Sequence, residues 1–123
     1  MNDVLIVEDE YDVREFIGQT LRRAGIACRM AGTGVQALNQ ARLSWPGLVL
    51  LDLSLPGQLD GWQVWDSLYQ MSAGRPLRVV IFAAEVSGDD RALADEWGAL
   101  AIIVKPVRAS QLVAIIQKTL SQN

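Results

Sequence analysis

Each of three short apolar runs in the sequence ends on charged residues, which follow in the order Glu8-Asp9, Asp52 and Lys105. Apolar runs this short, bounded by turn signals such as the Pro56-Gly57 that follows Asp52, indicate buried strands. Open α/β proteins bind their ligands at the carboxyl edge of a parallel sheet, where the strand ends meet. We therefore expect these charged side chains to form one site.

Three carboxylates at one edge need a compensating cation. Two carboxylates about 5 Å apart repel by roughly 3 kcal/mol at an effective dielectric constant of 20. Lys105 supplies one positive charge, and the chain has no His and one Cys, so carboxylate and carbonyl oxygens remain as ligands. This donor set favours Mg²⁺ over zinc. A free carboxylate beside Mg²⁺ suits formation of an aspartyl phosphate, because phosphoryl transfer needs mainly positioning and charge neutralisation.

A simpler interpretation assigns these residues to ordinary structural roles. Asp9 can favour the N-terminal dipole of the following helix, Glu8 can be solvated, and Lys105 can be a surface lysine. Each residue taken alone fits that interpretation. Their joint occurrence at strand ends favours a phosphoacceptor site.

Strand and helix patterns alternate five times along the chain. Strands are predicted at about 3–7, 26–30, 48–53, 77–83 and 100–104, and helices follow each of them. This pattern predicts an α/β fold, (βα)5, with a doubly wound five-stranded parallel sheet and right-handed crossovers. No linker or low-complexity stretch interrupts it, so we expect one domain over 1–123 with no output domain.

Several helix signals are specific enough to check. The first helix carries an apolar stripe of Val13, Phe16, Ile17, Leu21 and Ala24. Thr33 and Gln36 have the spacing of a capping box. The third helix is expected from about Asp60 to Ser72, with one side formed by Trp62, Trp65, Leu68 and Tyr69.

Composition narrows the function classes. The 123 residues are 50% hydrophobic, and the net charge is −3 without a basic run, so direct nucleic-acid binding is not expected. The lone Cys28 cannot form an intrachain disulfide. No apolar run approaches the ~20 residues that cross a bilayer, and no signal peptide is evident, so we expect a cytoplasmic protein without membrane insertion.

Over nearly its whole length the chain resembles the receiver domain of two-component response regulators (CheY-like). The motifs that carry the resemblance are Glu8-Asp9, the segment Asp52-Leu-Ser-Leu-Pro56-Gly57 and Lys105-Pro106. The resemblance implies a flavodoxin-like sheet in the order 2-1-3-4-5.

It also implies residue roles. Asp52 would accept a phosphoryl group from a phosphohistidine on a sensor histidine kinase or a histidine phosphotransfer protein, and the phosphorylated domain would then act on a downstream protein target. Mg²⁺ would be bound by Asp9, Asp52 and the backbone carbonyl of Ser54, with Glu8 acting through water. Lys105 would contact the phosphoryl oxygens, and its bond to Pro106 would be cis.

The chain departs from the family at both positions of the usual switch. The fourth strand of a receiver normally ends on Ser or Thr, and this chain has Ala83, which has no hydroxyl to donate. The Tyr or Phe usual three residues before the lysine is replaced by Ile102, a stiff β-branched residue. Locally, both are ordinary strand residues. We expect Asp52 to accept phosphate while the usual coupling to the face formed by the fourth helix and fifth strand is weak or rebuilt.

Two further positions can tune the phosphate lifetime. Glu85 and Ser54 correspond to family positions that flank the path of water to the phosphoryl group. Glu85 is equally consistent with a plain loop residue.

Other functions stay open. The chain can be a stand-alone receiver, a receiver cut from a larger regulator or hybrid kinase, or a phosphorylation-independent pseudo-receiver that binds proteins. A phosphatase of the haloacid-dehalogenase type would normally carry a second Asp two residues after the nucleophile, where this chain has Ser54. We expect a signalling domain and no enzyme beyond self-phosphorylation from small phosphodonors and self-dephosphorylation.

Overall fold

Five parallel strands form one sheet in the computed structural model, which describes residues 3–122. The strands are β1 (Val4–Val7), β2 (Cys28–Ala31), β3 (Leu48–Leu51), β4 (Val79–Ala83) and β5 (Ala101–Val104). Their order, β2-β1-β3-β4-β5, confirms the predicted fold. The three central strands β1, β3 and β4 are buried throughout, as their uninterrupted apolar runs predict.

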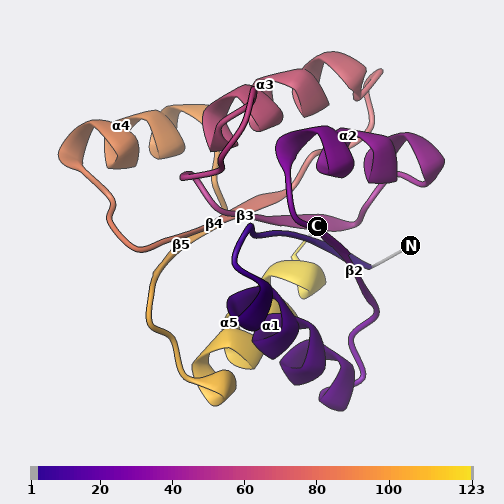
Figure 1. Ribbon diagram of the computed structural model, residues 1–123, viewed down its shortest axis with the longest axis vertical. Helices are drawn as coiled ribbons and strands as arrows, with labels where there is room; N and C mark the ends of the chain where they lie inside the picture. Colours follow the sequence, from indigo (N-terminus) through magenta and orange to yellow (C-terminus); the bar gives the residue numbers. More distant parts are fainter. Residues whose placement is uncertain (1–2, 123) are drawn as a thin grey trace.

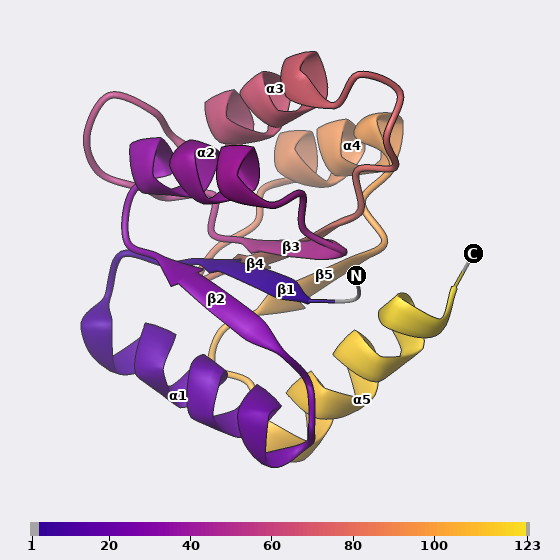
Figure 2. The ribbon, with the colours of Figure 1, turned by 90° about the vertical axis from the view of Figure 1, so that its right-hand side faces the viewer.

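Helices cover both faces of the sheet (Figures 1 and 2). Helices α1 and α5 lie on one face, and α2, α3 and α4 lie side by side on the other. The helices are α1 (Tyr11–Arg23), α2 (Gly34–Leu43), α3 (Gly61–Met71), α4 (Gly88–Trp97) and α5 (Ala109–Ser121). Each face has its own hydrophobic core, built from side chains that alternate along the strands. In the described part of the chain, every helix is too short or too polar to span a membrane.

The helix ends follow local sequence signals. The carboxylate of Asp60 accepts from the Gln63 N–H at 2.9 Å, and the Gln63 side chain accepts from the Asp60 N–H, which completes a capping box before α3. Thr33 caps α2 by accepting from the Gln36 N–H at 3.1 Å. The predicted capping box is wrong in its second half, because the Gln36 side chain accepts from Gly32 instead of Thr33.

Two residues of the predicted helix patterns lie outside the buried stripes. Ile17 and Leu21 are buried under the sheet, but Phe16 is 42% exposed at the edge of α1. On α3, Trp65 and Leu68 are buried, whereas Tyr69 is 68% exposed. A helix that covers a sheet buries only a narrow stripe, so apolar residues at its margin remain in solvent.

Candidate functional site

The charged residues lie at the carboxyl ends of three strands. Glu8 and Asp9 follow β1, Asp52 follows β3, and Lys105 follows β5. One backbone hydrogen bond continues the ladder beyond each strand end: Glu8 N–H to Ala31 O at 3.1 Å, Asp52 N–H to Val7 O at 3.0 Å, and Lys105 N–H to Ala83 O at 2.9 Å. The sheet itself therefore fixes where these side chains start.

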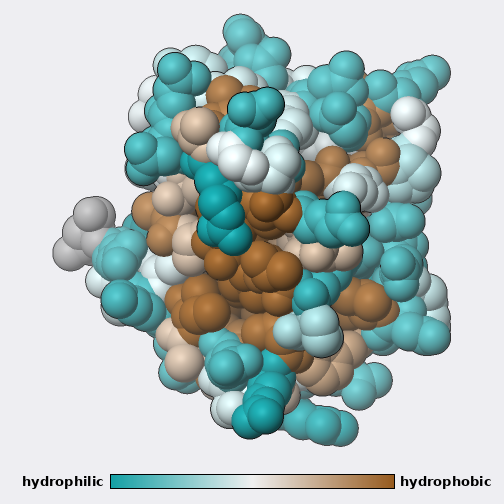
Figure 3. All heavy atoms as spheres, turned by 90° about the vertical axis from the view of Figure 1, so that its left-hand side faces the viewer, coloured by the Kyte–Doolittle hydropathy of each residue, from teal (hydrophilic) through white to brown (hydrophobic). Residues whose placement is uncertain are grey.

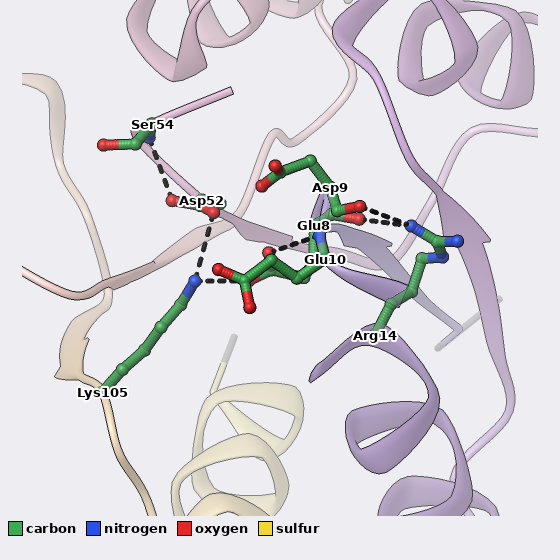
Figure 4. A network of polar contacts seen from close by, with 7 residues as sticks. All are labelled: Glu8, Asp9, Glu10, Arg14, Asp52, Ser54 and Lys105. Carbon is green, nitrogen blue, oxygen red and sulfur yellow. Dashed lines mark hydrogen bonds and ion pairs between the residues drawn. The ribbon is translucent and has the colours of Figure 1, made fainter. Parts of the chain in front are cut away.

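Lys105 bridges the two buried carboxylates (Figure 4). Its Nζ lies 2.5 Å from Glu8 Oε1 and 3.1 Å from Asp52 Oδ2. Glu8 is 1% exposed and Asp52 3% exposed, so both would be costly as isolated charges. The ammonium also lies 5.0 Å from the centre of the Phe82 ring. The lysine thus compensates charge that the apolar surroundings cannot.

Backbone N–H groups bind the remaining carboxylate oxygens. Ser54 donates to Asp52 Oδ1 at 2.9 Å, and Glu10 donates to Glu8 Oε2 at 3.1 Å. Each buried carboxylate is therefore held by one backbone amide and by Lys105. These contacts fix the orientation of the Asp52 carboxylate at the sheet edge. The ligand role expected for the Ser54 carbonyl stays a prediction.

Arg14 supports the site from α1, a role that the sequence did not indicate. Its guanidinium donates to the backbone carbonyl of Glu8 at 2.8 Å and of Asp9 at 3.3 Å. Figure 4 shows the side chain reaching from α1 to the loop that carries both acids. Helical side chains lean toward the helix N-terminus. An arginine in the first turns of a helix that follows an acidic loop is therefore a sequence signal for this contact.

The site contains three carboxylates and one lysine, so negative charge is in excess. Burial raises the pKa of Glu8, and the nearby charge of Asp52 raises it further, although hydrogen bonds from Lys105 and the Glu10 N–H partly offset this. Burial by itself would lower the pKa of Lys105. Hydrogen bonding and charge from Glu8 and Asp52 outweigh that effect, so the pKa of Lys105 is raised. The site favours an additional positive charge.

Glu8, Asp9 and Asp52 fit the predicted magnesium site. Each offers an oxygen, and the three oxygens lie within 4.8 Å of one another, with Asp9 exposed to solvent. Oxygens this close could be ligands of one ion after moving inward, with Glu8 acting directly or through water. The all-oxygen donor set is the one that Mg²⁺ prefers.

Gly61 lets α3 pack against the backbone of the phosphoacceptor candidate. A Cβ at this position would lie 2.5 Å from the carbonyl oxygen of Asp52 and 2.5 Å from the Cα of Leu53. The Gly61 N–H donates to the Leu53 carbonyl at 3.0 Å. No side chain fits this approach without moving the segment that carries Asp52.

The two positions of the usual switch have different surroundings. Ala83, at the end of β4, is fully buried. Ile102 in β5 is partly buried and packs against the core on the α2–α4 side. Glu85 is exposed in the loop before α4. The Lys105–Pro106 peptide bond is cis, as the resemblance implied.

The face that carries α4, β5 and α5 is turned to the viewer in Figure 3, with hydrophobic side chains gathered across its middle. A shallow hollow of about 370 Å³ on it includes Ile102, Val104, Val107 and Ile115 in its lining. Val104 is 44% exposed. The position of the missing aromatic switch residue thus borders an apolar surface.

Comparison with known proteins identifies the family. The family model for the response regulator receiver domain matches residues 4–117. The chain is 37% identical over 114 residues to the phosphate regulon transcriptional regulatory protein PhoB of Escherichia coli, which covers 93% of this chain and 49% of PhoB. It is 36% identical over 120 residues to the DNA-binding response regulator MtrA of Mycobacterium tuberculosis, covering 98% of this chain and 51% of MtrA.

Solved structures agree with this. The receiver domain of NtrX from Brucella abortus superimposes with a TM-score of 0.88 at 30% identity, covering 98% of this chain and all (100%) of that domain. This chain spans about half the length of the curated relatives that it matches. It belongs to the response regulator receiver family of two-component systems.

Proposed function

We propose that Asp52 accepts a phosphoryl group from a phosphohistidine on a sensor histidine kinase or histidine phosphotransfer protein, in a Mg²⁺-dependent reaction. The observation that carries this proposal is the convergence of three carboxylates within 4.8 Å, with Lys105 on Asp52. Bound Mg²⁺ would supply positive charge for the oxygens of the transferring group.

Each residue of the site has its own role in the proposed phosphoryl transfer. A carboxylate oxygen of Asp52 forms the new bond to phosphorus while the bond from phosphorus to the donor's histidine nitrogen breaks. The Ser54 N–H holds the second carboxylate oxygen in place. Lys105, already within 3.1 Å of Asp52, contacts the oxygens of the transferred group. Asp9 and Asp52 would ligate the ion directly, and Glu8 through water.

Signal output is proposed to differ from the usual receiver. Ala83 has no hydroxyl to move toward a phosphoryl group, and Ile102 has no ring to swing inward. Both ends of the usual relay are absent together, so we expect phosphorylation to move α4 and β5 little, or by another route. Glu85 and Ser54 are proposed to set the lifetime of the phosphorylated state.

The proposed partners are proteins. A sensor kinase or phosphotransfer protein supplies the phosphoryl group, and a downstream protein reads it in the cytoplasm. MtrA is named as a DNA-binding regulator, and this chain matches about half of it. The net charge of −3 supports the prediction that this chain itself does not bind nucleic acid.

The test is incubation with acetyl phosphate and Mg²⁺, followed by intact-mass measurement. We expect one phosphoryl adduct that requires Mg²⁺ and is absent in Asp52→Asn. Asp66→Asn, on the exposed surface of α3, is the matched control and should be labelled like the wild type.

Ala83 and Ile102 also support a second candidate, a pseudo-receiver that binds partners without phosphorylation. The same measurement separates the two candidates. Absence of an adduct in a protein shown to bind Mg²⁺ would favour the pseudo-receiver, and an adduct that persists in Asp52→Asn would remove Asp52 as the acceptor.

A further inference from the structure

Three tryptophans join α3 to α4 on the α2–α4 face of the sheet. The ring centres of Trp62 and Trp65 are 5.8 Å apart and stacked. Trp97 meets both edge-on, 5.3 Å from Trp62 and 5.4 Å from Trp65. The indole N–H of Trp62 donates to Asp90 at 3.3 Å, which links the two helices by a polar contact as well. These contacts fix the positions of the three rings relative to one another.

A cavity of about 390 Å³ opens beside this cluster. It is lined by Trp65, Asp66, Tyr69, Glu96 and Trp97. Tyr69 is 68% exposed and Trp97 38% exposed, so their aromatic surfaces are available to a ligand. The volume falls within the range of about 300–1,000 Å³ typical of ligand pockets.

The lining has the chemistry of a cation site. Faces of Trp and Tyr rings attract cations, and Asp66 and Glu96 add two carboxylates at the same cavity. Within residues 3–122, no lysine or arginine forms an ion pair with either acid or stacks on Trp65 or Trp97. The attraction for a cation is thus not met by the chain itself.

The end of α4 adds an independent sign. A helix C-terminus carries partial negative charge and favours basic residues. The last turn of α4 has none, and it carries Asp95 and Glu96 instead. This arrangement is locally unfavourable, and a cation from outside the chain would relieve it. Departures from local rules of this kind are typical of functional sites.

We propose that the cavity between α3 and α4 binds an arginine side chain of a partner protein. A guanidinium can stack on an aromatic face and pair with carboxylates at the same time, which an ammonium does less well. Arginine already stacks on tryptophan elsewhere in the described residues, with the Arg75 guanidinium 4.2 Å from the centre of the Trp45 ring. The cavity opens to solvent beside the exposed rings of Tyr69 and Trp97, so a residue on a larger surface covers it better than a free small molecule. The proposal does not depend on phosphorylation of Asp52.

The test follows the four tryptophan indole N–H signals by NMR during titration with the peptide acetyl-Gly-Ala-Arg-Ala-Gly-amide. We expect saturable shifts for Trp65 and Trp97 and little change for Trp45, which Arg75 already covers. The same peptide with citrulline, the neutral isostere of arginine, should not shift them.

Variants that neutralise acidic side chains test whether the two carboxylates of the cavity contribute to peptide binding. Asp66→Asn with Glu96→Gln should weaken peptide binding by about fivefold or more, the loss of roughly one charged contact. Asp12→Asn with Glu15→Gln on α1 removes equal charge far from the cavity and should bind as the wild type. Equal binding of the citrulline peptide, or unchanged binding by the cavity variant, would overturn the proposal. If arginine amide bound as tightly as the peptide, the proposal that the arginine belongs to a partner protein would be wrong.

Discussion

The surroundings of Glu8 act on its pKa in opposite directions. Burial raises its pKa, while Lys105 and the Glu10 N–H stabilise the charged form. Because its pKa in the folded state lies above the value of 4.5 for a free side chain, its contribution to stability is fully present below that value. That contribution is lost as the pH rises through the higher folded-state pKa. At neutral pH the charge of Glu8 therefore lowers stability, and the proposed cation would offset this effect.

Glu8→Gln should stabilise the Mg²⁺-free protein at pH 7, with a Tm higher by about 4 °C, because a buried charge is removed while an oxygen remains to accept from Lys105. The gap between variant and wild type should close toward pH 4. Calorimetry across this pH range measures it.

Glu15→Gln is the control, because Glu15 on α1 is less buried than Glu8. This variant should leave Tm nearly unchanged. A Glu8→Gln protein less stable than the wild type at pH 7 would show that the ion pair with Lys105 outweighs the cost of burial.

At the scale of elements, the connection from β3 to α3 positions Asp52. The N-terminus of α3 approaches the backbone of Asp52 and Leu53 so closely that only glycine fits at position 61. The capping box of Asp60 and Gln63 fixes the start of the helix at that point. The start of α3 and Asp52, the proposed acceptor, therefore form one structural unit.

Gly61→Ala should destabilise the protein by about 2 kcal/mol, since the new Cβ forces the Asp52 segment to move, and it should slow phosphorylation by acetyl phosphate. Denaturant unfolding and adduct formation measure the two effects. Gly88→Ala, where an added Cβ meets nothing within 4 Å, should instead stabilise α4 by up to about 1 kcal/mol. Similar behaviour of the two variants would contradict this view of Gly61.

Strand ends could be predicted from sequence better than helix margins. Apolar runs followed by charge located Asp52 and Lys105 at one edge, because parallel strands leave no freedom in where their ends meet. The exposure of Tyr69 and the packing of Trp97 against α3 depend on how two helices sit on the sheet, which a single-helix pattern does not contain. The contact from Arg14 depends on where loop carbonyls point, and periodicity carries no such information.

In the whole molecule, the sheet lies between the two helix layers, and its carboxyl edge carries the site. Each layer packs on its own core, and at the strand ends between them Glu8 and Asp52 are buried while Asp9 is exposed. A cation bound there stabilises only the folded state, because the three carboxylates converge only in the fold.

Mg²⁺ at 100 times its dissociation constant should therefore raise the free energy of unfolding by about 2.7 kcal/mol. Thermal unfolding at increasing Mg²⁺ measures this gain. Asp9→Asn should remove most of it, since Asp9 is an exposed proposed ligand whose loss does not disturb the core. An equal gain in Asp9→Asn would place the ion elsewhere.

NMR spectra with and without beryllofluoride, a phosphoryl mimic, in the presence of Mg²⁺ would test the phosphoacceptor site and the weakened switch together. We expect large shifts at Asp9, Asp52 and Lys105, with small ones over 85–98 and around Ile102. Ala83→Thr combined with Ile102→Tyr should extend the shifts into α4. Unchanged signals at the three site residues would contradict the phosphoacceptor site, and large shifts across α4 in the wild type would contradict the weakened switch.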